Sequence, residues 1–233
     1  MSLPRRLVAE GVGSILLAAT VIGSGVMAER LAGGNAAVAL LANTGATVAV
    51  LIVLISMLGP VSGAHFNPAV SLVQAMRQQL PVREACAYAV VQIGGCILGA
   101  ILAHAMFELP LIQQSTHVRS GAAQWLSELV ATAGLLLVVR SCTSPQQAAG
   151  RVAAWIGAAY WFTASTSFAN PAITIGRALS NTFAGIRPAD APGFIVAQLI
   201  GAVGALYLGR FLFDSRAETP KSTAREQIPS RTT

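Results

Sequence analysis

Charged residues are scarce in this sequence. Only 10% of its 233 residues are Asp, Glu, Lys or Arg, whereas 54% are hydrophobic. Soluble domains carry about 25% charged residues, so the composition excludes an ordinary soluble protein and predicts a membrane protein. The formal net charge is +6, but the basic residues are scattered among long apolar segments. We therefore expect no nucleic-acid partner, because that binding needs a clustered basic surface.

Cysteine and histidine are also rare. Cys86, Cys96 and Cys142 are too few and too far apart in the sequence for a disulfide framework or a metal site. The three histidines are isolated from one another, and the sequence has no nucleophile–base set, metal cluster or phosphate loop. We predict a protein that is not an enzyme and that binds neither a cofactor nor a metal.

Long apolar segments, by contrast, are abundant. Six of them have roughly the 20 residues that cross a bilayer. Two shorter segments, 67–77 and 170–182, cannot cross, and irregular backbone at that depth must be buried in protein or line a cavity. The sequence therefore predicts an all-α membrane protein with six transmembrane helices and two re-entrant half-helices. The expected spans are residues 7–28, 36–58, 82–105, 124–139, 148–167 and 191–213.

The same tripeptide begins both short segments. Asn is a preferred helix N-cap and Pro a preferred first helical residue, so each tripeptide predicts the start of a helix. Two helix N-termini that meet inside a membrane create a site of positive potential. Each Asn either caps its helix alone or also donates its amide to a solute, and two facing motifs favour donation. The motifs are Asn67, Pro68 and Ala69, and Asn170, Pro171 and Ala172.

The two halves of the chain repeat this order. Each has a Glu in its first span, Glu10 or Glu128, then a second span and then the tripeptide. With three spans per half, the halves run in opposite directions as an inverted repeat. We expect a channel domain over residues 1–213, with repeats at about 1–105 and 124–213, and a flexible cytoplasmic tail at 214–233. The distribution of Lys and Arg predicts that both termini are cytoplasmic.

These features resemble the aquaporin, or major intrinsic protein, family. The resemblance rests on the paired motifs within residues 62–70 and 168–172 and on the paired Glu10 and Glu128, and it covers the chain up to the tail. It implies that both carboxylates accept backbone hydrogen bonds from the re-entrant loops. It also implies a homotetramer in the plasma (inner) membrane, with one pore in each protomer.

Three further residues belong to the resemblance. Gln92 and Gln198 occupy matching places in the two halves, and we expect them to link helices or loops. His65 lies two residues before Asn67, the first residue of the first motif. It either lines the cytoplasmic approach to the pore or is a structural histidine.

The predicted selectivity filter departs from the family pattern. Family members usually place Arg directly after the second motif, where this chain has Ile173. Counting back from the motifs without gaps gives Thr47 in the second span, Ala158 in the fifth and Ser167 in the loop. With no bulky aromatic, imidazole or guanidinium at these positions, we predict a wide, Arg-less pore. Arg177, one turn beyond Ile173, is either a partial substitute at the outer vestibule or a surface arginine.

The resemblance and the expected filter together predict a membrane channel. Water and small uncharged polar solutes would diffuse passively through it, including glycerol, urea and neutral metalloid acids such as arsenite. One alternative is a water-selective aquaporin, and another is a structural membrane protein with a closed pore. A secondary transporter fits less well, because it needs a coupling carboxylate in the pathway and both in-span carboxylates already have scaffold roles.

Overall fold

All regular secondary structure in the described part of the chain is helical. The computed structural model describes residues 1–214, so the predicted tail after Asp214 lies outside the described residues. Loops of varied length, the longest of them between α4 and α5, and a single turn of 3₁₀ helix, η1 (Pro188–Asp190), connect the α-helices. The long helices are α1 (Leu3–Leu31), α2 (Ala36–Ser62), α4 (Val82–Met106), α5 (Ala122–Ser141), α6 (Pro145–Phe162) and α8 (Ala191–Phe213), and the short ones are α3 (Pro68–Met76) and α7 (Pro171–Ala178).

Both short helices begin at the repeated tripeptide. The side chain of Asn67 accepts a hydrogen bond from the Ala69 N–H, and that of Asn170 accepts one from the Ala172 N–H, each at 2.9 Å. Proline follows each cap at the first helical position, where a missing N–H costs nothing. The local sequence therefore sets where each half-helix starts.

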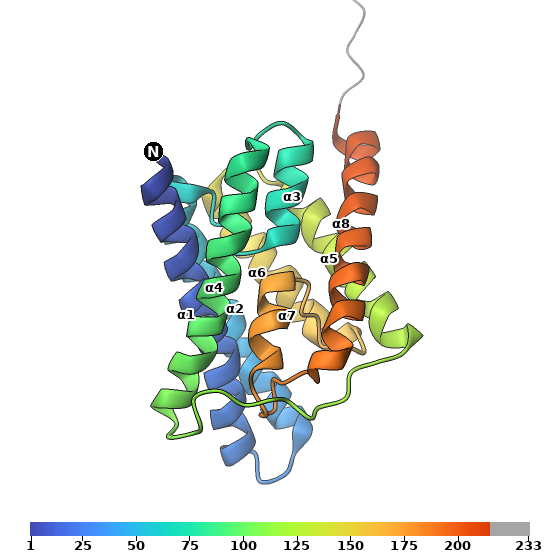
Figure 1. The fold of residues 1–233 in the computed structure, drawn as a ribbon. Coiled ribbons are helices and arrows are strands. Elements are labelled where there is room, and N and C mark those ends of the chain that lie inside the picture. The colour runs from blue at the N-terminus through green and yellow to red at the C-terminus, as the bar shows by residue number, and fades with distance from the viewer. Residues whose placement is uncertain (215–233) are drawn as a thin grey trace, which may run out of the picture.

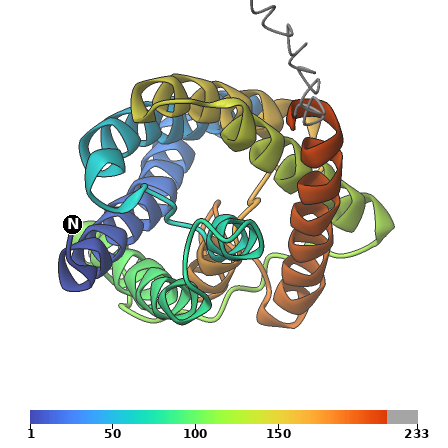
Figure 2. The same cartoon turned by 90° about the horizontal axis from the view of Figure 1, so that it is seen from above.

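The long helices form two groups that enclose the short ones. α1 packs on α2 and α4, α5 packs on α6 and α8, and the contact between α2 and α6 joins the groups. Viewed from above, the long helices make a ring around α3 (Figure 2). α3 and α7 occupy opposite halves of the bundle, and the N-terminus lies on the same side as the end of α8 (Figure 1).

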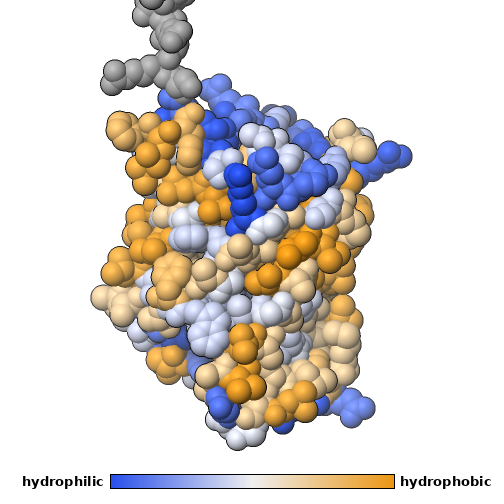
Figure 3. Space-filling model, turned by 180° about the vertical axis from the view of Figure 1, so that it is seen from behind, coloured by the Kyte–Doolittle hydropathy of each residue, from blue (hydrophilic) through white to orange (hydrophobic). Residues whose placement is uncertain are grey.

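The outer surface of the bundle suits a bilayer. Five helical segments are long and apolar enough to cross one: α1, α2, α4, α5 and the stretch from η1 through α8. The sixth predicted span, α6, is shorter and carries Gln146, Gln147 and Arg151 near its start, which lower its hydropathy. Apolar side chains cover much of the flank, and hydrophilic ones gather mainly toward the two ends (Figure 3).

Glycines allow the helices of each group to approach closely. A Cβ on Gly95 of α4 would lie 2.7 Å from the Gly11 carbonyl oxygen of α1, and one on Gly99 would meet the Ile15 carbonyl oxygen. In the other group, a Cβ on Gly201 of α8 would meet the Leu129 carbonyl oxygen of α5. Small residues at such contacts are the usual means of packing helices in membranes.

Two predicted segments end earlier than the sequence suggested. α6 stops at Phe162 rather than at residue 167, because Thr163 is extended and Thr166 and Ser167 adopt positive φ angles of 59° and 50°. α7 stops at Ala178 rather than at residue 182. The residues past the two ends, 163–167 and 179–182, are mostly Ser, Thr and Asn. Their side chains can bond to nearby backbone outside a helix, so these residue types favour loops.

Candidate functional site

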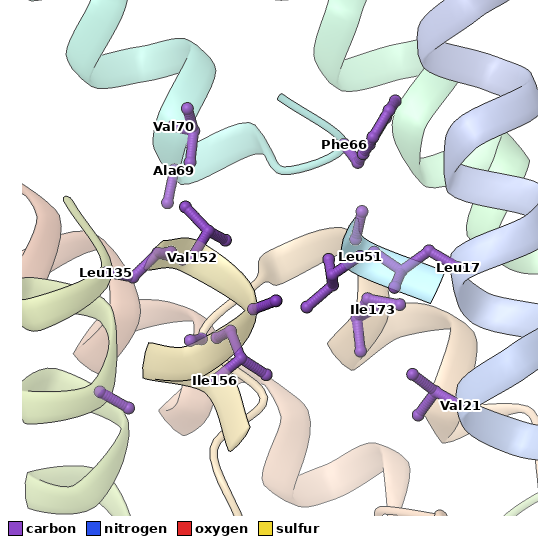
Figure 4. Close-up of a cluster of buried hydrophobic side chains, with 14 of the residues drawn as sticks. Leu17, Val21, Leu51, Phe66, Ala69, Val70, Leu135, Val152, Ile156 and Ile173 are labelled. Carbon is purple, nitrogen blue, oxygen red and sulfur yellow. The ribbon is translucent and has the colours of Figure 1, made fainter. Parts of the chain in front are cut away.

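A cavity of about 120 Å³ lies between the two groups of helices. Four long helices, α1, α2, α5 and α6, and both short helices with their preceding loops contribute to its walls. Side chains of Val152 and Ile156 from α6 extend toward the same space as Leu51 and Ile173 (Figure 4). The long helices thus give the cavity a largely apolar wall, and its polar side chains come both from the loops before α3 and α7 and from helices.

The two motif asparagines are linked across the wall of this cavity. The Asn67 amide nitrogen donates to the Ala169 carbonyl oxygen at 2.7 Å, and the Asn170 amide nitrogen donates to the Phe66 carbonyl oxygen at 2.8 Å. Each motif is therefore bound to the loop that precedes the other. A primary amide has two N–H donors, so each Asn retains one donor beyond this cross-link, and both residues line the cavity.

Glu10 lies where a carboxylate can bind the first loop. It is fully buried, and it accepts hydrogen bonds from the backbone N–H groups of His65 at 3.0 Å and Phe66 at 2.7 Å. The Ser62 hydroxyl and the Gln92 amide also donate to it, at 2.6 and 2.8 Å. A buried carboxylate needs such donors to offset its lost hydration, and Glu10 does not line the cavity.

Glu128 makes the equivalent contacts in the second half. It is fully buried and accepts from the backbone N–H groups of Phe168 and Ala169, both at 2.8 Å. The Gln198 amide donates to it at 2.6 Å and to the Thr174 hydroxyl at 3.0 Å. In the first half, Gln92 bonds Ser71 in the same way at 3.1 Å. Both glutamines thus link a long helix to a half-helix.

The backbone before each motif is unusual at matching positions. Ala64 and Phe66 have φ angles of 51° and 48°, and Ser167 and Ala169 have φ angles of 50° and 48°. Non-glycine residues adopt this left-handed region at a cost, so surrounding contacts must hold them there. The carboxylate–amide bonds do so, and the carbonyl oxygens of Phe66 and Ala169 are left to face the opposite motif.

His65 contributes to the cavity wall and is also held by neighbours. Its Nδ1 lies 3.0 Å from the Ser71 hydroxyl, and its ring packs edge-on to Tyr88 at a centroid distance of 5.4 Å. The two alternatives left open by the sequence therefore coexist, because the imidazole is anchored and lines the cavity.

Three of the four predicted filter residues line the cavity: Thr47, Ser167 and Ile173. The fourth assignment, Ala158, is wrong, because this residue is exposed on the outer face of α6. The cavity face of α6 repeats every four residues through Val152, Ile156 and Tyr160, and position 158 lies on the opposite side.

Tyr160 stands in the place expected for Ala158. It is 3% exposed, it lines the cavity, and its hydroxyl lies 3.2 Å from the Thr47 hydroxyl. The ungapped count from the second motif missed it. The four-residue spacing of Ala148, Val152, Ile156 and Tyr160 was the signal in the sequence that would have found it.

The predicted absence of arginine from the pore is also wrong. Arg177 is 3% exposed and lines the cavity, four residues beyond Ile173 on the same face of α7. Its Nε donates to the Ala184 carbonyl oxygen, and its guanidinium carbon lies 3.3 Å from the centre of the Phe168 ring. With Tyr160 and Arg177 in its wall, the cavity has both a bulky aromatic and a guanidinium, so the reasoning that led to a wide pore fails.

Residues 1–214 contain no cluster of side chains suited to hold a metal ion. No group of three or more His, Cys, Asp or Glu side chains lies together there. The two buried carboxylates, Glu10 and Glu128, are surrounded by backbone and amide N–H groups. These groups are hydrogen-bond donors, so they add no further ligand for a cation.

Comparisons with known proteins agree on one family. The sequence model described as Major intrinsic protein matches residues 1–165. The chain is 51% identical over 229 residues to a Rhizobium meliloti protein named aquaglyceroporin AqpS, covering 97% of this chain and 98% of that protein. It is 29% identical over 198 residues to aquaporin NIP1-1 of Zea mays, covering 78% of this chain and 67% of that protein.

A solved structure has the same fold. The X-ray structure of the aquaglyceroporin from Plasmodium falciparum matches with a TM-score of 0.65, covering 89% of this chain and 95% of that chain. The sequence identity is 19%, so this similarity concerns the fold alone.

Proposed function

This chain belongs to the major intrinsic protein family, and from that premise we propose that it is a membrane channel for passive diffusion of water and small uncharged solutes such as glycerol. The observation that carries the proposal is the pair of facing Asn motifs in a central cavity. Two helix N-termini and two amide donors offer hydrogen bonds to solute oxygens, and the positive ends of the helices oppose cations.

Glycerol suits the two kinds of wall in this cavity. Leu51, Val152 and Ile156 offer an apolar surface to its carbon chain, while the re-entrant loops offer polar groups to its hydroxyls. A solute that keeps contacts on both sides loses less on leaving water than one with polar groups all round. The name of the Rhizobium meliloti relative, an aquaglyceroporin, is consistent with this solute.

We also propose urea and neutral metalloid acids such as arsenite as solutes. Undissociated arsenite is uncharged and carries three hydroxyls, as glycerol does, so the same donors would serve it. The water-selective alternative keeps one observation in its favour, because the large side chains of Tyr160 and Arg177 both occupy the cavity wall.

A carrier mechanism has less support. Glu10 and Glu128 are each committed to two backbone N–H groups and a glutamine amide, so neither is available to bind and release a coupling proton. Nor do these contacts resemble a catalytic set, and we propose no enzymatic role. A homotetramer in the plasma membrane with both termini cytoplasmic is our proposal for the assembly, by family resemblance and by the distribution of basic residues.

Osmotic assays on proteoliposomes test the proposed function. After a step increase in external glycerol, vesicles with the protein should shrink and reswell quickly, and the initial flux should rise linearly with the gradient. Urea and arsenite gradients test the further solutes in the same vesicles. Rapid shrinkage without reswelling in glycerol would favour the water-selective alternative, and saturating flux would favour a carrier. Protein-free vesicles are the control.

A further inference from the structure

We propose that Arg177 is the specificity-determining cation of this channel. From one turn beyond Ile173, its guanidinium donates hydrogen bonds to uncharged solutes that carry several hydroxyls, and its charge excludes protons and other cations. The inference rests on the proposed function and adds to it the group that selects the solute.

The position of Arg177 is fixed by two contacts. Its Nε donates to the Ala184 carbonyl oxygen, and its guanidinium packs over the Phe168 ring at 3.3 Å. Among residues 1–214, the guanidinium makes one hydrogen bond, and its Nε is the donor. The N–H donors of its two terminal nitrogens therefore stay unused within this range. Because the residue lines the cavity, those donors are available to a solute.

A second arginine supports this arrangement from outside the cavity. Arg119 lies in the segment between α4 and α5, and it donates to the Gly185 carbonyl oxygen at 2.8 Å and the Ser165 carbonyl oxygen at 3.2 Å. Its guanidinium carbon is 5.2 Å from the centre of the Phe168 ring. The ring and the loop that carries it are thereby held in place beside Arg177.

The charge of Arg177 is not neutralised by a carboxylate. The ion pairs among the described residues are Arg6–Glu84, Arg140–Asp214 and Arg187–Asp190, and none includes it. A charge with little water around it acts strongly on a neighbouring ion, since the effective dielectric constant is low. Its potential adds to that of the α3 and α7 N-termini and opposes the entry of a cation.

Hydroxyl groups in the cavity wall complement the guanidinium. The Ser167 hydroxyl is buried and has no hydrogen-bond partner among residues 1–214. The Thr47 and Tyr160 hydroxyls, 3.2 Å apart, belong to the same cavity. Arginine only donates, whereas these hydroxyls can also accept, so the set suits a solute whose own hydroxyls do both. A polyol or an undissociated trihydroxy acid has that chemistry.

The test removes the guanidinium from position 177, or transfers it to position 173, and measures which solutes and ions pass. Proteoliposomes are prepared with the wild-type chain, Arg177→Ala, Arg177→Gln and the double variant Ile173→Arg/Arg177→Ala. Water, glycerol and 1,3-propanediol fluxes are measured osmotically, and proton leak is followed with an internal pH-sensitive dye. Arg187→Ala is the matched control, because that arginine binds Asp190 and does not line the cavity.

We expect Arg177→Ala and Arg177→Gln to raise proton leak by about tenfold or more while water still passes. The preference for glycerol over 1,3-propanediol should fall in both, since the guanidinium donors that bind the additional hydroxyl of glycerol are removed. The double variant should restore low leak, which a merely structural arginine would not allow, and Arg187→Ala should match the wild type.

Unchanged proton leak in both single variants, with water and glycerol still passing, would overturn the proposal. Loss of all water flux in both would also overturn it, because Arg177 would then hold the loop rather than select. A wild-type chain that passes neither water nor glycerol would instead refute the proposed function.

Discussion

At the scale of single residues, the two buried glutamates hold the re-entrant loops in place without lining the cavity. Glu10 and Glu128 hold two successive backbone N–H groups of each re-entrant loop. Those bonds offset the cost of the left-handed residues Phe66 and Ala169, whose carbonyl oxygens then receive the facing Asn amides. Two carboxylates that do not line the cavity therefore position asparagine side chains that do.

Replacing Glu128 by Gln should destabilise the fold. The amide nitrogen of Gln would face an N–H donor of Phe168, Ala169 or Gln198, so a buried donor would lose its acceptor. We expect a loss of about 2–4 kcal/mol, seen as a lower melting temperature in detergent, and reduced water flux.

The matched control for this prediction is Glu84→Gln. Glu84 pairs with Arg6 at 2.6 Å, but both side chains are partly exposed, so the loss should stay below about 1 kcal/mol. Equal effects of the two substitutions would show that Glu128 has no special part in holding its loop.

Tyr160 gives a second prediction at this scale. Its ring occupies the cavity beside Thr47, so Tyr160→Ala should raise glycerol flux, on the order of threefold, by widening the passage. Ala158→Val changes an exposed position and should leave flux unchanged. Osmotic reswelling of proteoliposomes measures both, and a larger effect at 158 than at 160 would restore the ungapped filter assignment.

At the scale of elements, the half-helices depend on tight packing of the long ones. α7 approaches α4 so closely that a Cβ on Gly176 would lie 2.8 Å from the Cys96 carbonyl oxygen. α4 in turn packs on α1 through Gly95 and Gly99. Because a half-helix cannot span the bilayer, its place is set by these neighbours rather than by its own length.

Gly99→Leu should therefore weaken the contact between α4 and α1. The added side chain meets the Ile15 carbonyl oxygen and the Ala18 methyl group, and we expect a cost of about 1–3 kcal/mol. Gly94→Leu is the control, since nothing lies within 4 Å of a Cβ there. Thermal unfolding in detergent compares them, and equal melting temperatures for the two variants would contradict the packing argument.

At the scale of the whole molecule, two similar halves enclose one cavity. Each half supplies three long helices and one half-helix, and the motifs of the two halves bind each other across the middle. Residues of both halves line the cavity, so neither half alone forms the proposed passage. The chain begins and α8 ends on the same side of the bundle (Figure 1).

Cysteine labelling tests this arrangement in a membrane. In a chain whose three native cysteines have been replaced, Ser2→Cys and Asp214→Cys should react with an impermeant maleimide from the cytoplasmic side. Thr116→Cys, in the exposed segment between α4 and α5, should react from the opposite side. Labelling of Ser2→Cys and Thr116→Cys from one side would contradict the proposed topology.

The sequence alone determined the number of helices, their order and the starts of both half-helices. These features follow from local causes: apolar length for the spans, and an Asn–Pro pair for α3 and α7. It also singled out Glu10 and Glu128, because an ionisable side chain in an apolar segment requires a partner.

Only the tertiary structure decided which side chains face the pore. Ala158 and Tyr160 are two residues apart, and the rotation of α6 within the bundle turns one outward and the other into the cavity. Likewise, Arg177 enters the cavity because Phe168 and Ala184, brought to it by the folding of the loops, hold its guanidinium there. Counting along a chain fixes neither, since a helix's rotation and a loop's path are set by packing between segments far apart in sequence.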